Sequence, residues 1–367
     1  MKNQKEHSRE HISFKSFKFK IFKLCTLRSC CSSSQSVLGK TLLSLLPALA
    51  CGCTAEVIAP SAETAECNAR ILMEGHVPAE NLSSLDIFVF KNDELGLVDC
   101  YQRIDHPEEW DGNVCSSAGD RTISICANSR MTIDEWPWIR SREGLKKISV
   151  NLEQERREYP FMSGEIHVRA KKDSPIYAGL SLRPLASEIY LRSVCCDFTG
   201  KPYAGEEITE AKVYLTNINA ECGMLEDGDI RPGRLINSAR LCPEDVDSFE
   251  DPGLIYQELD HNIGKAWIKP EIRLWCYPSN GYEESMGTPF SRMVIEGKIA
   301  GHTYYWPVNI NRDSGSSGID RNRQYIYDIK ITRKGSTDPD IPVEADDMEI
   351  TFKTAIWEEK ENCIVGF

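Results

Sequence analysis

Two cysteines near the N-terminus have the surroundings of a lipid-acylation site. Cys51 and Cys53 directly follow the apolar run of residues 41–50, and a basic stretch precedes that run. A basic region, a short apolar region and small residues before a cysteine are typical of an exported lipoprotein signal. The run is too short to cross a bilayer as a permanent helix, which needs about 20 residues. We therefore predict that residues 1–53 are a lipoprotein signal peptide and lipobox, acylated at Cys53 or Cys51.

The remaining cysteines show no metal-binding pattern. The chain has fifteen cysteines, and none of those beyond Cys53 forms a C-x-x-C pair. Neither a zinc site nor a thioredoxin-like site is therefore predicted. An exported chain permits disulfides, but the spacing does not show which cysteines pair. Cys126 and Cys276 lie inside apolar strands and are also explained as buried free thiols.

No pattern of histidine, serine or carboxylate residues indicates catalysis. The seven histidines form neither H-x-x-x-H nor H-E-x-x-H. Residues 315–318, Gly-Ser-Ser-Gly, resemble a nucleophile elbow only superficially, because a loop is expected there. Asp227 and Asp229 alternate as in calcium loops, but the other ligand positions of an EF-hand are not filled. We predict no catalytic residue, no metal site and no cofactor.

Two further groups of residues have both a functional and a structural interpretation. Paired carboxylates act as glycosidase acids only if the fold brings two of them across a cleft, and solvated surface is their commoner role. Tryptophans can stack on sugars, but at strand spacing they more often fill a core. The carboxylate pairs are residues 108–109, 206–207 and 346–347, and the tryptophans are Trp136, Trp138, Trp267, Trp275 and Trp306.

The composition is that of a folded protein with an acidic body. The 367 residues are 41% hydrophobic and 9% aromatic, and the net charge is −13. This length can hold two domains of ordinary size. Residues 1–50 carry a net charge of about +7, which leaves about −20 for the remainder. An acidic body is a poor ligand for nucleic acid, so we predict no nucleic-acid partner.

Short alternating segments predict an all-β fold with little helix. Period-2 patterns indicate half-buried strands, and turn residues separate them. This arrangement is typical of two β-sandwich domains in tandem. We predict a flexible tether over residues 54–66, an N-terminal domain over 67–180 and a C-terminal domain over 181–367. The strands before the last hairpin are residues 69–73, 85–90, 98–104, 122–128, 165–170, 177–183, 188–194, 210–217, 266–277 and 293–300.

Two stretches interrupt the series of strands. Residues 132–152 have helical spacing, with Thr132 and Glu135 placed as a capping box. Pro137 disrupts a helix interior, so we expect a short or broken helix there. Residues 220–262 are acidic and contain three prolines, and we expect a long loop, which on a compact domain is usually functional or a surface excursion.

The segment of residues 304–331 predicts a hairpin. Alternation over residues 304–310 and again over 325–331 indicates two half-buried strands. Residues 312–322 are rich in Gly, Ser and Asp, so we expect an exposed loop joining antiparallel partners. Pro307 removes a backbone donor and indicates an edge or bulged position.

The chain is expected to end in an amphipathic strand on a tether. Residues 335–347 contain two prolines and little to bury, which predicts an extended linker. In the strand that follows, residues 348–357, one face carries Met348, Ile350, Phe352 and Ile356. Such a strand can complete its own sheet, or it can be donated to the groove of a neighbouring molecule. The pattern alone leaves both alternatives open.

Six stretches, taken in order, resemble the type V pilin superfamily of Bacteroidetes, the fimbrillins that build surface fimbriae. Together they extend over some 250 residues, behind the lipoprotein signal and before the tethered strand. The stretches are residues 85–90 (LDIFVF), 123–128 (ISICAN), 161–164 (FMSG), 182–191 (LRPLASEIYL), 304–310 (YYWPVNI) and 320–325 (DRNRQY), the last leading to 329–332 (IKIT).

The resemblance implies two transthyretin-like Greek-key sandwich domains, anchoring in the outer membrane and assembly with other pilin subunits by donor-strand exchange. In that scheme a protease cuts after an Arg, an N-terminal strand leaves, and the groove accepts another subunit's C-terminal strand. The groove strand maps near residues 69–73 and the donor onto residues 348–357. Arg70 and Arg103 are the candidate processing sites, although neither has a recognisable cleavage context, which leaves an uncleaved anchor or a tip subunit open.

The sequence thus predicts a non-enzymatic subunit of surface fimbriae that contributes to adhesion to a host or bacterial surface ligand. The alternative is a surface glycan-binding lipoprotein, in which exposed tryptophans and the loop of residues 220–262 hold sugar.

Overall fold

The computed structural model describes most of the chain beyond residue 68. All the described residues belong to one compact unit, Glu56–Phe367. The predicted acylation sites Cys51 and Cys53, the tether of residues 54–66, Asp227 and Asp229 lie outside the described residues. The described ranges are 69–76, 82–132, 134–172, 175–225, 230, 232–280, 284–285, 289–312, 318–341, 348–356 and 364–365.

The predicted all-β fold with minor helix is confirmed. Strands dominate the described ranges, where the only α-helices are α1 (Arg142–Lys146) and α2 (Pro243–Asp247). Neither helix is long or apolar enough to cross a membrane. The division into domains at residues 180 and 181 stays a prediction.

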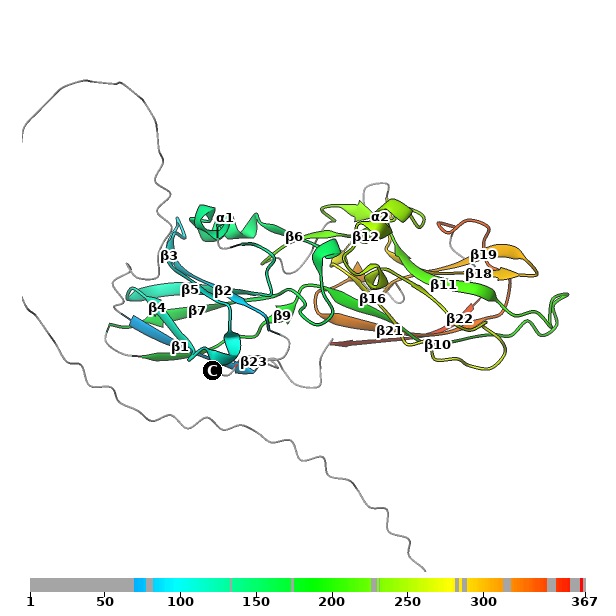
Figure 1. The fold of residues 1–367 in the computed structure, drawn as a ribbon, viewed down its shortest axis with the longest axis horizontal. Coiled ribbons are helices and arrows are strands. Elements are labelled where there is room, and N and C mark those ends of the chain that lie inside the picture. Colours follow the sequence, from blue (N-terminus) through cyan, green and yellow to red (C-terminus); the bar gives the residue numbers. More distant parts are fainter. Residues whose placement is uncertain are drawn as a thin grey trace, which may run out of the picture. The chain divides into compact units, whose positions relative to one another are not determined.

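Two sheets are built from residues 69–184 (Figure 1). The larger has the order β3-β2-β5-β7-β9, and in the smaller β1 lies between β4 and β8. Alternate residues of β2 and β5, among them Ile87, Val89 and Ile125, share an apolar cluster with Val114 of β4. The strands are β1 (Ala69–His76), β2 (Leu85–Lys91), β3 (Val98–Ile104), β4 (Asn113–Ser116), β5 (Gly119–Ala127), β7 (Met162–Ala170), β8 (Ile176–Gly179) and β9 (Arg183–Pro184).

Two further sheets are built from residues 187–356. Their orders are β16-β10-β21-β22 and β15-β11-β18-β19. Buried residues of both sheets, among them Leu191, Val213 and Trp306, belong to one core. The strands are β10 (Ser187–Cys196), β11 (Thr209–Thr216), β15 (Tyr256–Glu258), β16 (Ile272–Cys276), β18 (Arg292–Ile299), β19 (His302–Asn309), β21 (Arg323–Ile331) and β22 (Met348–Ile356).

The helical stretch is broken, as Pro137 predicts. A 3-10 turn, η3 (Trp136–Trp138), is followed by the short helix α1, whose N-cap Ser141 accepts a hydrogen bond from the Gly144 backbone N–H. Trp136 packs edge-on against Phe88 of β2, with ring centroids 5.2 Å apart. These turns therefore cover one face of the larger N-terminal sheet.

The predicted hairpin is wrong, although both of its strands exist. β19 pairs with β18, whereas β21 pairs with β10 and β22 in the opposite sheet. Alternation shows that a segment is a strand, but it does not show its partner. Pro307 does lie in an edge strand, because β19 ends its sheet.

The expectation that residues 220–262 form a long loop is also wrong. This stretch contains short elements, and Ile230, Ile236 and Leu254 are fully buried in the same core cluster as the C-terminal sheets. Single apolar residues scattered among acidic ones give no periodic signal, which is why the packing was hidden. The elements are β13 (Glu221–Gly223), β14 (Leu235–Ile236), α2, the 3-10 turn η5 (Pro252–Leu254) and β15.

Candidate functional site

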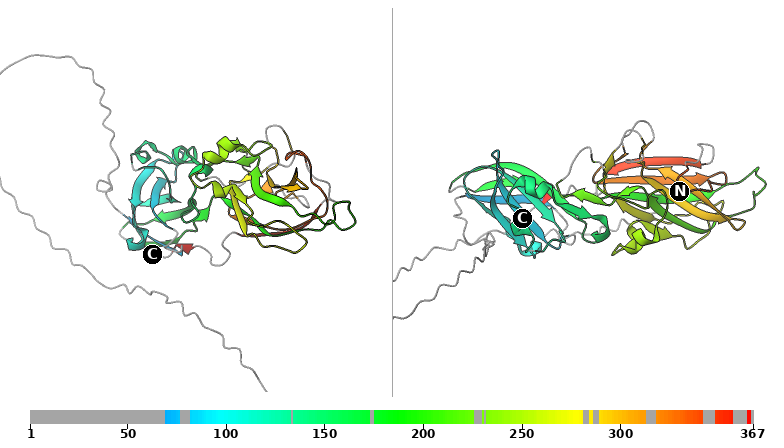
Figure 2. Two further views of the ribbon diagram at one scale, coloured as in Figure 1. Left: turned by 45° about the vertical axis from the view of Figure 1, so that its right-hand side comes forward. Right: turned by 90° about the horizontal axis from the view of Figure 1, so that it is seen from above.

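Strand β22, the predicted donor strand, lies at the edge of its sheet. It pairs antiparallel with β21 from Ile331↔Met348 to Arg323↔Ile356. Among the described strands it has no neighbour on its other side. Figure 2, right, shows β22 (red) at the rim of the sheet. The strand has therefore folded back onto its own sheet, and it is hydrogen-bonded along one border only.

The inner face of β22 is only partly covered. The register places Ile350 and Phe352 opposite Ile329 and Tyr327, and Phe352 lies 5.0 Å from the Tyr327 ring centroid. Ile329 is fully buried, but Ile350 is 37% exposed. On the outer face Glu349 pairs with Lys330 at 3.1 Å. Since burial contributes about 25 cal/mol per Å² of apolar surface, β22 is held less firmly than the strands inside the sheet.

The opposite edge of the same sheet is protected. Two side chains bind the outer edge of β16. Arg157 Nη2 and Gln257 Nε2 both donate to the carbonyl oxygen of Arg273, at 3.0 and 3.1 Å. Side chains that cap an edge prevent pairing with another strand. The two edges therefore differ: side chains cap β16, whereas no described strand pairs with the outer side of β22.

The expected linker of residues 335–347 is partly anchored, contrary to the sequence prediction. Residues 333–341, here called the strap, lie on β19 of the other sheet. Trp306 donates through Nε1 to the carbonyl oxygen of Arg333 at 3.1 Å. Tyr305 and Ser336 exchange two backbone hydrogen bonds, both 2.9 Å long. Polar residues can be fixed by hydrogen bonds without burying apolar surface, so composition did not reveal the strap.

The first strand, β1, is the middle strand of its small sheet. It pairs antiparallel with β4 and parallel with β8. The chain's last described residues, Ile364 and Val365, pair with the end of β1. Removal of β1 would therefore leave two separated strands, β4 and β8, with a strand-wide gap between them.

The two candidate processing residues lie in strands. Arg70 is in β1, opposite Cys115 of β4. Arg103 is in β3 and contacts Asp86 at 3.0 Å and Asp105 at 2.7 Å. Asp86 is fully buried, and this burial raises its pKa to about 6 although Arg103 opposes the shift. A strand held in a sheet is a poor protease substrate, since cleavage is concentrated at exposed loop tips.

Neither arginine lies where a cut would free β1 alone. A cut after Arg70 would leave residues 71–76 of β1 attached to the chain, and a cut after Arg103 would also sever β2 and β3. Between Arg70 and Arg103 the sequence contains no other arginine. The structure thus does not bring Arg70 or Arg103 together with β22, and the sequence has no arginine between β1 and β2 at which a cut would release β1 alone.

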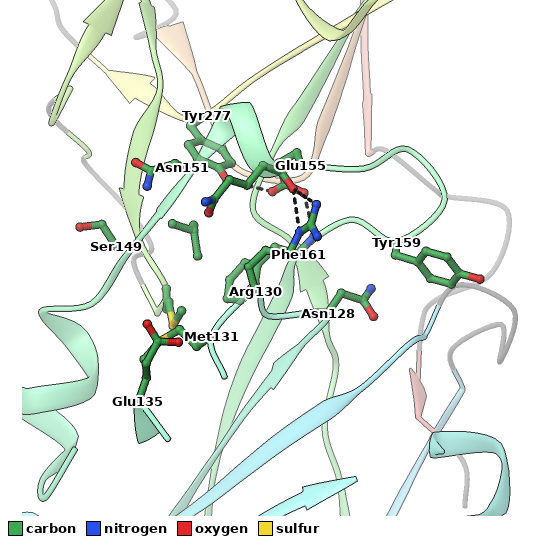
Figure 3. A pocket seen from close by; sticks show the side chains of 13 residues that line it. Asn128, Arg130, Met131, Glu135, Ser149, Asn151, Glu155, Tyr159, Phe161 and Tyr277 are labelled. Atoms are coloured by element: carbon green, nitrogen blue, oxygen red, sulfur yellow. Dashed lines mark hydrogen bonds between the residues drawn. The ribbon is translucent and has the colours of Figure 1, made fainter. Parts of the chain in front are cut away.

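A cavity of about 150 Å³ lies beside the segment of residues 149–161 (Figure 3). Glu155 is buried there and accepts hydrogen bonds from the Phe161 backbone N–H and the Tyr277 hydroxyl, both at 2.9 Å. Burial raises the pKa of Glu155 to about 7. Tyr159 points away from these groups in Figure 3. The carboxyl is occupied by structural hydrogen bonds, so this arrangement does not form a nucleophile and base pair.

The remaining candidate residues do not form a common site. Trp136, Trp275 and Trp306 are buried, while Trp138 is 67% and Trp267 is 52% exposed. Cys126 and Cys276 are buried free thiols, and burial raises the pKa of both. Across the described ranges, no three His, Cys, Asp or Glu side chains lie together so as to hold a metal ion.

Solved structures share this fold. One is a candidate cell adhesion protein from Bacteroides eggerthii, with 14% identity and a TM-score of 0.60 over 81% of this chain and 96% of that chain. Another, from Parabacteroides distasonis, is also a candidate cell adhesion protein, with 15% identity and a TM-score of 0.57 over 79% and 96%. A fimbrilin from Porphyromonas gingivalis has 15% identity and a TM-score of 0.56 over 83% and 100%. No family model matches the sequence, and no curated protein sequence does.

Proposed function

We propose that this chain is a structural, non-enzymatic subunit of surface fimbriae of the type V pilin kind. The shared fold with a fimbrilin and with candidate cell adhesion proteins supports the proposal. The six ordered stretches that resemble fimbrillins support it independently. In this proposal the chain is exported as a lipoprotein, is acylated at Cys53 or Cys51, and reaches the outer membrane and cell surface.

The subunit assembles by donating β22 to a neighbouring subunit. The observation that carries this step is the edge position of β22, which is bonded on one side and has Ile350 and Phe352 only partly covered. A strand that is paired on one side loses one ladder of hydrogen bonds when it leaves its sheet. It forms two ladders when it enters a groove between two strands. Main-chain pairing gives affinity, and alternate side chains in pockets give specificity.

The placement of arginines supports a terminal subunit of the fibre. Because no arginine lies between β1 and β2, an arginine-specific cut does not release β1 alone. β1 then stays between β4 and β8 and fills the position that would accept a donor strand. A lipid-anchored subunit that donates β22 and accepts no strand would be the anchor at the base of the fibre, with other pilin subunits as its partners.

Deletion of residues 348–367 tests the donor role. The truncated chain should be secreted and folded, as judged by circular dichroism, because the sheet retains β16, β10 and β21. It should not be incorporated into surface fibres, which can be measured by immunoblotting of sheared material. Fibres that carry the truncated chain at the normal level would show that β22 is not the donor.

A further inference from the structure

We propose that the strap stays bound to the sandwich when β22 leaves, with Arg292 as the residue that positions it. The donated segment then begins after Ile341 rather than at the end of β21. This inference rests on the proposed function, because it describes how the donor strand is attached to the subunit that supplies it.

The backbone of the strap is paired with the edge of β19. The reciprocal bonds between Tyr305 and Ser336, each 2.9 Å long, form an antiparallel bridge. The indole N–H of the buried Trp306 bonds to the Arg333 carbonyl oxygen. The two Tyr305 bonds satisfy backbone groups of β19 that would otherwise form an open sheet edge, and the indole bond satisfies a carbonyl group of the strap.

Two side-chain features hold the centre of the strap. The Lys334 ammonium lies over the rings of Tyr203 and Tyr304, 4.7 and 5.2 Å from their centroids. The next residue, Gly335, is so close to the Tyr305 carbonyl oxygen that a Cβ atom would clash with it. Only glycine permits this approach of the two backbones, so a side chain at position 335 would push the strap away from β19.

Arg292 fixes the far end of the strap. Its side chain is only 3% exposed, and its guanidinium pairs with Asp340 of the strap and with Glu284 at 2.6 Å. It also donates from Nε to Asn309 on β19 at 2.9 Å. A buried guanidinium is costly without partners. Release of Asp340 would therefore be opposed, whereas release of the partly exposed β22 would not meet this cost.

The strap and β22 lie on different sheets, so one can leave without the other. The strap pairs with β19, while β22 pairs with β21. Seven residue steps separate Ile341 from Met348, and a chain of that length spans at most about 25 Å. With the strap in place, the groove of the neighbouring subunit must therefore open within that distance of Ile341.

Two matched disulfide staples test the inference. The first joins the strap to β19 through Tyr305→Cys and Ser336→Cys. The second joins β22 to β21 through the facing pair Ile326→Cys and Lys353→Cys. Facing positions of antiparallel strands have Cα atoms about 4.5–5.5 Å apart, which a disulfide can bridge. Peptide mapping confirms that each new pair has formed, and circular dichroism confirms the fold.

Incorporation into surface fibres is then measured with and without reductant. The strap staple should leave incorporation at the wild-type level, whereas the β22 staple should lower it at least tenfold until reductant is added. If the strap staple also blocks incorporation, the strap must detach and the inference is wrong, although the donor role stands. If the β22 staple has no effect, β22 is not donated and the proposed function itself fails.

The positioning role of Arg292 is tested on the same background. Asp340→Asn removes the charge that Arg292 binds and keeps the size of the side chain, so the fold should persist. Incorporation should fall several-fold, and the strap staple should restore it. A loss that the staple does not restore would contradict a positioning role for the Arg292–Asp340 pair.

Discussion

The ring of Phe352 on β22 lies 5.0 Å from the ring of Tyr327 on β21, at an interplanar angle of 33°. This contact is one of the apolar attachments of β22, together with the buried Met348 at the start of the strand, whereas Ile350 is 37% exposed. A tyrosine buried in the sandwich thus faces a phenylalanine that is only half-buried. This pair contributes to how firmly β22 is held in its own sheet.

The first prediction concerns this pair. Phe352→Ala should weaken the attachment of β22 by about 1–2 kcal/mol, less than the 3–5 kcal/mol typical of a fully buried phenylalanine. Amide hydrogen exchange should show faster opening of β22 and unchanged protection of β10. Thr351→Ala, on the outer face, is the matched control and should change stability by less than about 0.5 kcal/mol. Equal effects of the two changes would contradict the assigned faces.

The second prediction concerns the N-terminus of the mature protein. Mass spectrometry of protein extracted from the cell surface should find an acylated cysteine, Cys53 or Cys51, followed by an intact β1. The reason is that no arginine lies between β1 and β2. A mature chain that starts after Arg70 or Arg103 would show that the subunit is processed, and the anchor assignment would be wrong.

The third prediction concerns the buried carboxyl of Glu155. Its pKa is about 7 in the folded protein and 4.5 ordinarily, so the folded state binds a proton more tightly than the unfolded state. The contribution of Glu155 to stability is therefore greatest below about pH 4.5, falls as pH rises and is flat above about pH 7, a loss of about 3 kcal/mol. Glu155→Gln should remove this loss and raise the free energy of unfolding at pH 8.

Urea unfolding at pH 5 and pH 8 measures this effect. The wild-type protein should lose more stability than Glu155→Gln between the two values. Glu153→Gln is a matched control, because Glu153 lies on the same turn and its carboxylate pairs with Arg234 instead of accepting from Phe161 and Tyr277. A Glu155→Gln variant with the same pH dependence as the wild type would contradict the raised pKa.

The fourth prediction concerns Asp86 and Arg103. Arg103→Ala leaves the buried Asp86 carboxylate without its cation, so the free energy of unfolding should fall by about 3 kcal/mol at pH 8. Because the pKa of Asp86 is already about 6 and rises further without Arg103, the loss should be smaller at pH 5, where the carboxyl is neutral. A loss of the same size at both pH values would show that the ion pair is not its cause.

Much of the fold can be predicted from the alternation of apolar and polar residues. Period-2 patterns located β2, β5, β10, β21 and β22 to within a few residues, because each strand places one face in a core. Partners were not readable in the same way, and β19 and β21 were wrongly joined since pairing depends on the whole sheet. The short strand β4 was missed because a four-residue segment carries too little alternation to distinguish it from a turn.

The candidate site can be predicted from the sequence only in part. The two faces of β22 followed from alternation, and its apolar face is the one that the register turns toward Tyr327 and Ile329. The strap was not readable, because it is held by Trp306, Arg292 and backbone bonds rather than by its own apolar residues. Polar segments of this kind reveal their anchoring only when the partner strand is known.

The donor role of β22 is tested most directly in intact fibres. A photo-reactive amino acid in place of Lys353, on the exposed face of β22, will react with whatever strand lies beside it. Mass spectrometry should identify cross-linked peptides from a neighbouring subunit. Cross-links confined to β21 of the same chain would show that β22 stays in its own sheet in the fibre, and would contradict the account.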